Sequence, residues 1–369
     1  MTALLRRREA LALIGAAALA PRLARAGVID GRVALLSRGF NLPDQVPLRQ
    51  AGAPDRATLK WLRERGMRHV RLPMRGESVM TRFSSAATIR ATIDDFNRAL
   101  DLLLGLDFAV SPDMHPGANF AHLHRADPEA AFSALSDGWR NLVKPIRRLP
   151  ADRVFAELLN EPQTEDAIWR AQAERLVAAL RDELPFTTFI AGPAPYQRVE
   201  ALAAWLPLKD PNVVYAFHYY DPMAFTHQGL TWDASSPLSR LDGVPFPAWR
   251  GEPAMTRLLE ALRARGDADL ASSIDRALDR PWDRRTIAAQ FAPLADWSER
   301  HGAPVILNEF GVLRFKAPRE ARLEWLKAVR EAAQTCRFGW AHWDYNQGFG
   351  LLDEAGRPDV ALVDVLLPG

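Results

Sequence analysis

Residues 155–162 read Phe-Ala-Glu-Leu-Leu-Asn-Glu-Pro, and residues 305–311 read Val-Ile-Leu-Asn-Glu-Phe-Gly. Each stretch is an apolar run typical of a buried strand, which ends in Asn-Glu and then breaks at Pro or Gly. A carboxylate at the end of a buried strand is costly to desolvate unless it has a partner. The two stretches therefore predict that Glu161 and Glu309 meet at one site that is fed by two strands.

Strand patterns alternate with helical patterns along the rest of the chain. Strands are predicted at residues 33–41, 69–74, 108–115, 154–162, 187–192, 213–221, 304–312 and 338–345. Helices are predicted at residues 55–65, 89–104, 128–148, 165–184, 199–205, 284–301, 318–335 and 359–366. This alternation indicates the α/β class and a (β/α)8 TIM barrel. A doubly wound open sheet is disfavoured, because no Gly-rich phosphate loop follows the first predicted strand.

One connection, residues 222–283 after the sixth predicted strand, is much longer than the others. Connections of this length usually carry function, and the loops after barrel strands build the active face. The insertion contains Trp232, Trp249 and Trp282. We expect it to form one wall of a substrate cleft, with the alternative that it is a structural flap anchored by buried tryptophans.

Composition narrows the class of protein. The chain has 369 residues, with 48% hydrophobic and 25% charged residues, as in an ordinary soluble domain. A formal net charge of +2 gives no support for nucleic-acid binding. Cys336 is the one cysteine, so neither an internal disulfide nor a cysteine-based metal site is possible.

The amino terminus has the pattern of an export signal. Arginines at 6–8 precede an apolar run at 10–20 that is too short to span a bilayer, and Ala-Arg-Ala at 24–26 offers a cleavage site. The pattern resembles a bacterial twin-arginine signal. We expect a signal peptide at 1–26, a catalytic domain at 27–369, a periplasmic or extracellular location and no stable membrane insertion. The alternative is an amphipathic leader helix of the folded domain.

Polar or aromatic side chains stand at the carboxyl ends of nearly all the predicted strands. Taken alone, each has an ordinary structural explanation, such as a hydrogen-bonded core histidine. The joint pattern is more specific, because the carboxyl ends of barrel strands meet at one opening. A retaining glycosidase needs two carboxyl groups about 5–5.5 Å apart at such an opening. The candidate site residues are Arg71, His115, Asn160, Glu161, His218, Tyr220, Glu309 and Trp343.

Several short motifs carry a family resemblance. The most specific are Leu-Asn-Glu-Pro at 159–162 and Asn-Glu-Phe-Gly at 308–311, and Arg-Leu-Pro at 71–73, Asp-Met-His at 113–115 and His-Tyr-Tyr at 218–220 add to them. With these motifs the chain resembles glycoside hydrolase family 5, the cellulase family of clan A. The resemblance spans the whole predicted barrel and implies hydrolysis of glycosidic bonds.

The resemblance also implies roles for individual residues. Glu161 would be the general acid/base and Glu309 the nucleophile. Asn160 would hydrogen-bond the sugar 2-hydroxyl, and Arg71 and Tyr220 would hold the nucleophile.

Three further residues would contact the substrate or the acid/base. His115 and His218 would contact the sugar or the acid/base, and Trp343 would lie under the reacting sugar ring, whose C–H face packs on a flat indole. Strand alternation puts Trp340 on the other face of its strand, which makes it the weaker candidate for that platform.

The two carboxyl groups need different environments. The acid must keep its proton near neutral pH, whereas the nucleophile must be ionised. Glu161 has no cation in its own motif and faces a second negative charge, which predicts a raised pKa for its carboxyl group. Arg71 and the Tyr220 hydroxyl beside Glu309 would favour its charged form.

Other chemistries fit the sequence less well. His115, His122 and His124 could in principle bind zinc. However, His122 and His124 are two apart in a predicted polar loop, and no His-Glu-x-x-His motif occurs. The Gly-x-Ser-x-Gly elbow of a serine hydrolase is also absent. We therefore expect no metal and no cofactor.

The sequence as a whole indicates a secreted, monomeric, retaining β-glycosidase that acts on a β-linked oligo- or polysaccharide, as an endoglucanase or cellulase does. An exo-β-1,3-glucanase, a β-mannanase or a glucan transglycosylase would use the same barrel. A non-catalytic carbohydrate-binding barrel is the alternative from another class.

Overall fold

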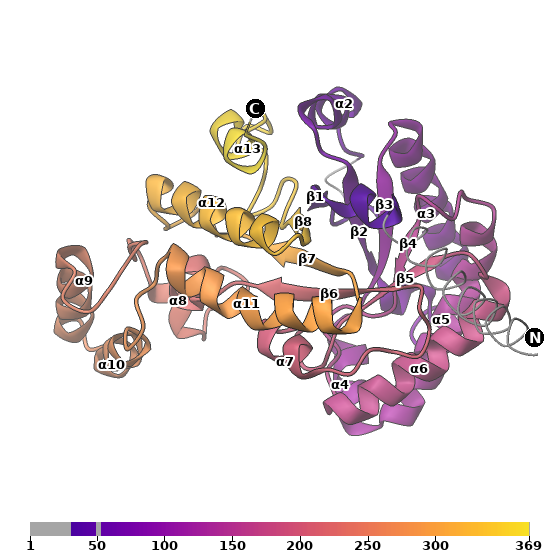
Figure 1. Cartoon of the computed structure of the whole chain (residues 1–369), viewed down its shortest axis with the longest axis horizontal. Helices are drawn as coiled ribbons and strands as arrows, with labels where there is room; N and C mark the ends of the chain where they lie inside the picture. Colours follow the sequence, from indigo (N-terminus) through magenta and orange to yellow (C-terminus); the bar gives the residue numbers. More distant parts are fainter. Residues whose placement is uncertain (1–30, 49–52, 369) are drawn as a thin grey trace, which may run out of the picture.

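The described residues, 31–48 and 53–368 of a computed structural model, form a closed barrel of eight parallel strands (Figure 1). Each strand pairs with the next along the chain, and the last pairs with the first. The strands are β1 (Gly39–Asn41), β2 (His69–Arg75), β3 (Ala109–His115), β4 (Phe155–Glu157), β5 (Thr188–Ala191), β6 (Val213–Tyr219), β7 (Val305–Phe310) and β8 (Gly339–His342). The predicted (β/α)8 barrel is confirmed.

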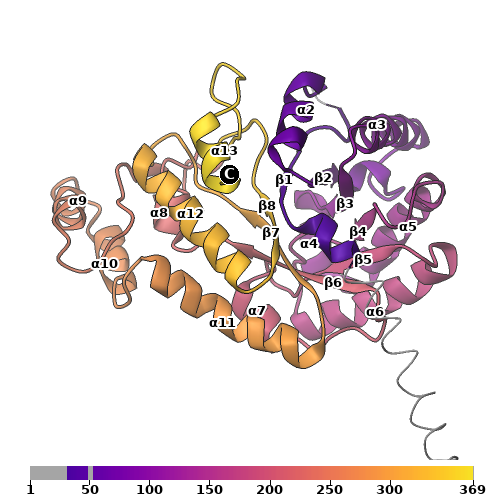
Figure 2. The same ribbon diagram turned by 45° about the horizontal axis from the view of Figure 1, so that its top comes forward.

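Helices follow the strands and cover the outside of the barrel (Figure 2). The helices in the described part of the chain are α2 (Arg56–Arg65), α3 (Ala86–Gly105), α4 (Ala118–Ala126), α5 (Pro128–Arg147), α6 (Asp166–Glu183), α7 (Val199–Ala204), α8 (Met223–Thr226), α9 (Pro253–Ala264), α10 (Ala268–Ala277), α11 (Arg284–His301), α12 (Arg319–Thr335) and α13 (Val360–Leu366). Short 3-10 helices are η1 (Ala34–Leu36), η2 (Gly76–Val79) and η3 (Pro237–Arg240). None of these helices is both long and apolar enough to cross a membrane.

Local sequence sets where the helices begin and end. The Asp55 carboxylate accepts backbone N–H groups at the start of α2, and Gly66 ends that helix with a φ of 114°. In the same way Asp283 caps the start of α11, and Gly302 ends it with a φ of 58°. Because these signals are local, the sequence predicts the bounds of both helices to within a residue.

The first predicted strand is wrong over most of its length. Residues 33–41 were expected to be extended, but the chain forms η1 first and only then β1. Leu36 is fully buried against the first residues of β3, β4, β6 and β7, and Val33 and Leu35 pack beside it. The run is apolar because it closes the amino-terminal end of the barrel, and not because it pairs as a strand.

The barrel interior is apolar at its amino-terminal end and polar at its carboxyl-terminal end. Its amino-terminal layer is apolar and consists of Leu36, Ala109, Phe155, Ile190, Val214, Ala216 and Ile306. Two residues further along β3 and β4, the same inward face carries buried Ser111 and Glu157, and β3 continues to Asp113. Side chains on a strand alternate between faces, so β3 and β4 deliver polar groups to the carboxyl-terminal mouth.

A bulge in β7 brings two consecutive polar residues into the mouth. Leu307 pairs with Phe217 and Glu309 pairs with His218, which leaves Asn308 as the extra residue. On a regular strand Asn308 and Glu309 would point to opposite faces. Because of the bulge both side chains are buried in the barrel mouth, at 0% and 5% exposure.

Two regions contain helices that the sequence did not predict. Residues 118–126, expected to be a loop, form α4. The long insertion contains α9 and α10, which lie together at one edge of the molecule, away from the barrel (Figures 1 and 2). Their apolar faces pack on each other, a pattern that the Pro- and Gly-rich flanking residues obscure in the sequence. The predicted signal peptide, residues 1–26, lies outside the described residues.

Candidate active site

A buried arginine organises the barrel mouth. Arg71 on β2 is fully buried, and its guanidinium nitrogens lie 2.9 Å from Asp113, 2.6 Å from Glu157 and 2.5 Å from Glu309. Burial alone would lower the pKa of Arg71, but the attraction of the three carboxylates raises it well above its usual range. One permanent cation thus ties together carboxylates from β3, β4 and β7.

Side-chain amides complete this ion network. Arg71 donates at 3.0 Å to the Asn41 amide oxygen and at 2.8 Å to that of Asn160. Asn308 donates at 2.9 Å to Glu157. Buried charges are costly unless further hydrogen bonds support them, and these amides supply such bonds to Arg71 and Glu157.

Glu309 is held by two donors. Its Oε1 accepts from Arg71, and its Oε2 accepts from the Tyr220 hydroxyl at 3.0 Å. Burial raises the pKa of Tyr220, and the negative charge of Glu309 raises it further, so the hydroxyl stays a neutral donor. Both contacts fix the orientation of the Glu309 carboxylate in the barrel mouth.

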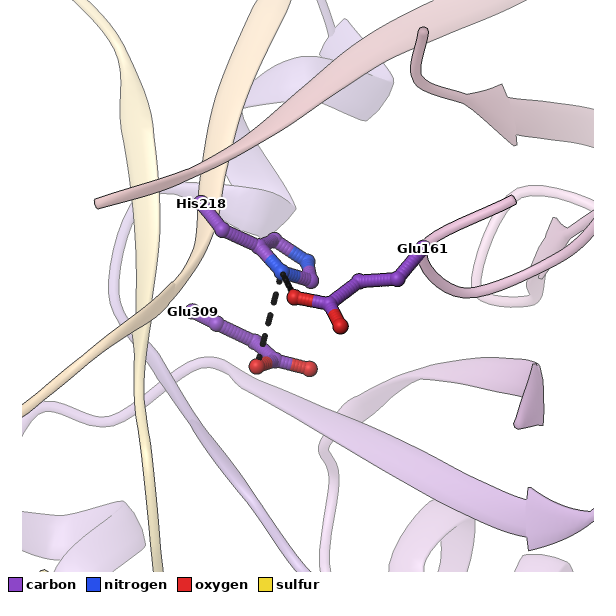
Figure 3. A group of neighbouring side chains, drawn as sticks. All are labelled: Glu161, His218 and Glu309. Atoms are coloured by element: carbon purple, nitrogen blue, oxygen red, sulfur yellow. Dashed lines mark hydrogen bonds and ion pairs between the residues drawn. The ribbon is translucent and has the colours of Figure 1, made fainter. Parts of the chain in front are cut away.

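Glu161 has a different environment from Glu309. It lies in the loop that follows β4, and its φ of 42° is left-handed, a conformation that costs about 1–2 kcal/mol for a residue other than glycine. His218 Nδ1 lies 2.9 Å from Glu161 Oε1 and 3.5 Å from Glu309 Oε2, so its ring reaches both carboxylates (Figure 3). One oxygen of each carboxylate and one His218 nitrogen all lie within 4.8 Å of one another.

The pKa of Glu161 runs opposite to the prediction. Burial raises the pKa of its carboxyl group, but the hydrogen bond and charge of His218, with the charges of His115 and Arg71, outweigh burial and lower it. Burial lowers the pKa of His218, and the charges of Glu309 and Glu161 more than reverse this effect. Both directions favour an ionised Glu161 beside a protonated His218. The sequence suggested that His218 contacts the sugar or the acid/base, but it did not predict that this contact lowers the pKa of Glu161.

His115 and Trp343 form the opposite side of the mouth. Their rings are stacked, with centroids 5.9 Å apart and planes at 21°. His115 Nδ1 lies 2.8 Å from Asp113, and this carboxylate raises the pKa of His115 against burial, which lowers it. Trp343 lines the cleft, whereas Trp340 is fully buried behind β8.

The mouth opens into a cleft of about 850 Å³. A second hollow of about 380 Å³ shares His115, Trp343 and Gln347 with it. The groove therefore continues on both sides of the Trp343 ring. All of the predicted site residues except Arg71 and Asn160 line the larger cleft, and these two lie directly beneath it.

The three tryptophans of the insertion have different positions. Trp232 is 62% exposed and lines the cleft, next to Phe349. Trp249 is also exposed, but it does not line the cleft. Trp282 is 5% exposed and donates its indole N–H to Ala277 O. Only the first part of the insertion forms the cleft wall, and neither Trp249 nor Trp282 contributes to it.

The histidines considered as zinc ligands do not converge. His124 lies on α4, is buried and contacts Gln172, while His122 is exposed on the same helix. Glu161, His218 and Glu309 do have donor spacing that a cation could accept. However, Glu309 already accepts hydrogen bonds from Arg71 and Tyr220, and the charge of Arg71 opposes a second cation.

The sequence did not single out five residues that contact this network. Asp113 and Glu157 precede His115 and Glu161 in the quoted motifs, and strand alternation could have placed both inside the barrel. The other three are Asn41, Gln197 and Asn308, whose contacts come from separate strands and are not encoded locally.

Two carboxylates paired at the mouth of a (β/α)8 barrel are the arrangement of a glycoside hydrolase. The cellulase family model, glycosyl hydrolase family 5, matches residues 37–348, and the chain therefore belongs to this family. The resemblance drawn from its motifs is confirmed.

Similar proteins include several endoglucanases. Endoglucanase 3 of Fibrobacter succinogenes is 28% identical over 253 residues, which are 65% of this chain and 37% of that protein. The chain thus spans little more than a third of that relative. Endoglucanase C of Acetivibrio thermocellus is 22% identical over 84% of this chain and 89% of its own length. The solved structure of endoglucanase Cel5A from Thermotoga maritima has a TM-score of 0.70 at 22% identity and covers 92% of this chain and 99% of its own.

The hydrogen bond between Glu161 and His218 leads to a direct prediction. Replacing His218 by glutamine removes its charge, which lowers the pKa of Glu161, and leaves the effect of burial, which raises it. We expect the pKa of Glu161 to be higher in His218→Gln than in the wild-type protein. Carboxyl-carbon NMR titration measures it. His124→Gln, a buried histidine outside the cleft, is the control. A Glu161 pKa that stays constant or falls in His218→Gln would contradict the assignment.

Proposed function

We propose that this protein is a secreted, monomeric, retaining β-glycosidase of the endoglucanase type. The observation that carries the proposal is the close pairing of Glu161 and Glu309, with one oxygen of each within 4.8 Å. Retaining glycosidases hold their carboxyl groups about 5–5.5 Å apart, and inverting ones about 6.5–9.5 Å apart to admit a water molecule. The short spacing supports direct attack by one carboxylate on the sugar.

Glu309 is the nucleophile and Glu161 the acid in the first half of the reaction. Glu309 is buried between Arg71 and the Tyr220 hydroxyl, which both donate hydrogen bonds to it and orient it. Its oxygen bonds to the anomeric carbon as the bond from that carbon to the leaving oxygen breaks. Glu161 protonates the leaving oxygen with a proton that it receives from His218, whose Nδ1 lies 2.9 Å from Glu161 Oε1.

Glu161 is the base in the second half. Once Glu309 is bonded to the sugar, its negative charge is gone, and an ionised Glu161 is no longer repelled by it. Glu161 then takes a proton from water, whose oxygen attacks the anomeric carbon and releases Glu309. Two inversions at one carbon return the original β configuration.

The substrate is a β-linked glucan or a related polysaccharide. Trp343 offers a flat apolar face to a sugar ring, and Asn160 and His115 beside it offer hydrogen-bonding groups. A groove that extends to both sides of Trp343 supports binding of a chain longer than one sugar. The endoglucanases of Fibrobacter succinogenes and Acetivibrio thermocellus named above support a glucan substrate. A purely carbohydrate-binding role would not require the buried donors to Glu309.

Stereochemistry with azide tests the two roles independently of any relative. Glu309→Ala should abolish turnover, because no other group forms the glycosyl intermediate. Glu161→Ala should lose about 10²–10⁴-fold in rate on substrates with poor leaving groups, and much less on activated aryl β-glycosides, which need no protonation. With azide and an activated substrate, Glu161→Ala should give the β-glycosyl azide and Glu309→Ala the α-azide, as read by NMR.

Three results would contradict the proposed roles, the retaining mechanism or the enzymatic function. Exchanged azide products would reverse the roles of Glu161 and Glu309. An α-configured first product from the wild-type protein would reject the retaining mechanism. Wild-type protein that binds β-glucan without releasing reducing sugar would favour the carbohydrate-binding alternative.

Substitution of two insertion tryptophans should affect different properties, substrate binding for Trp232 and stability for Trp282. Trp232→Ala should raise KM for long β-glucan oligosaccharides by roughly 2- to 10-fold, which corresponds to about 0.5–1.5 kcal/mol of lost stacking. Trp282→Ala should instead lower the free energy of unfolding by about 3–5 kcal/mol through loss of a buried ring. Steady-state kinetics and thermal denaturation measure the two effects. Equal loss of stability in both variants, with KM constant, would make Trp232 structural as well.

We also propose that residues 1–26 direct export to the periplasm or beyond. The motivation is the arginine cluster and the Ala-Arg-Ala sequence before Gly27. Amino-terminal sequencing of the exported protein should find Gly27 first. Replacing Arg7 and Arg8 together by lysine should retain the precursor in the cytoplasm, whereas Arg6→Lys should not. An active cytoplasmic protein that keeps Met1 would overturn the proposal.

A further inference from the structure

Gln197 lies directly behind the acid/base, and no sequence motif points to it. It follows β5, is fully buried and has a left-handed φ of 50°. Its side-chain oxygen accepts the backbone N–H of Glu161 at 2.9 Å. Its side-chain nitrogen donates to Glu157 at 3.4 Å, and its backbone oxygen accepts the His218 N–H at 2.8 Å.

These contacts fix the main chain at Glu161. With a φ of 42°, Glu161 occupies a conformation that persists only where the surroundings impose it. Gln197 holds its N–H, and Gln163 donates to its carbonyl oxygen at 3.2 Å. The Glu161 backbone is therefore clamped on both sides, so the direction of its carboxyl group is set before any substrate binds.

Gln197 also connects the acid/base with the nucleophile through a chain of contacts. Glu157, its partner on one side, is an ion-pair partner of Arg71, which in turn contacts Glu309. His218, its backbone partner on the other side, reaches Glu161 and Glu309. A single side chain thus connects the loop that carries Glu161 with the network that holds Glu309.

The position requires an amide of this length. The oxygen must face an N–H group and the nitrogen must face a carboxylate, which neither an acid nor an apolar side chain can do. Gly192 leaves the space that the Gln197 side chain occupies, because a Cβ at residue 192 would clash with the Gln197 side-chain nitrogen. The glycine and the glutamine therefore fit each other as a pair.

We propose that Gln197 is a positioning residue. It holds the Glu161 carboxyl group at the position, relative to Glu309, that proton transfer to and from the glycosidic oxygen requires. The inference rests on the proposed roles of these two glutamates. Gln197 is fully buried and does not line the cleft, so it acts through the Glu161 backbone.

A comparison of two substrates tests this role. Gln197→Met keeps the length of the side chain and removes both hydrogen bonds. The value of kcat/KM reports formation of the glycosyl intermediate, which needs Glu161 for a poor leaving group but not for an activated aryl group. We expect kcat/KM on an unactivated β-glucan oligosaccharide to fall at least about 10-fold more than on an activated aryl β-glycoside.

Azide gives a second readout that a loss of stability would not change. With the activated substrate, Gln197→Met should be slow in the step where Glu161 acts as base. Added azide should then raise kcat at least about 10-fold and give β-glycosyl azide, because azide needs no base. Gln197→Asn keeps the amide but shortens the side chain, which withdraws the amide from Glu161. It should show a weaker loss of kcat/KM on the unactivated substrate and a weaker azide rescue. This variant carries the test if Gln197→Met does not fold.

Gln228→Met is the matched control. Gln228 is equally buried, and its side chain bonds to Phe225 and Val244 within the insertion and to neither glutamate. The Gln228→Met variant should have lower thermal stability, but the ratio of kcat/KM on the oligosaccharide to kcat/KM on the aryl glycoside should stay unchanged. Equal losses on both substrates, without azide rescue, would overturn the role of Gln197. Absence of glycosidase activity in the wild-type protein would instead overturn the proposed function.

Discussion

The buried ion network around Arg71 is the constraint on which the rest of the site depends. A guanidinium and three carboxylates sit where desolvation is severe, and removing one partner from such a group typically costs about 3–5 kcal/mol. The network therefore permits few arrangements. It requires β2, β3, β4 and β7 to end at matching heights, and it fixes Glu309 relative to all of them.

The barrel supplies this network by dividing its interior into two layers. Apolar side chains fill the amino-terminal end, with Leu36 beneath them, and charged groups fill the mouth. The bulge in β7 then adds Asn308 to the face that already holds Glu309. Glu161 stands apart on a loop, and its partner is a histidine and not an arginine. Two carboxylates with unlike surroundings are what an acid and a nucleophile need.

Fold prediction succeeded where the signals are local. Helix caps such as Asp55 and Asp283 and the apolar strand cores are legible in short windows of sequence. It failed where one pattern has two possible causes. Residues 33–36 are apolar because they plug the barrel, and α9 and α10 are hidden by Pro- and Gly-rich flanks. Short windows carry no information about what a segment packs against.

The sequence by itself determined the alternation of strands and helices, the family, and which polar residues stand at the strand ends. Each of these follows from neighbours in the chain. Tertiary structure alone decided the rest: that Arg71 joins three carboxylates, that His218 lowers the pKa of Glu161, that Gln197 clamps its backbone, and that Trp232 lines the cleft while Trp282 is buried. These features arise between segments distant in the sequence, because electrostatics and packing depend on distances in space and not on order along the chain.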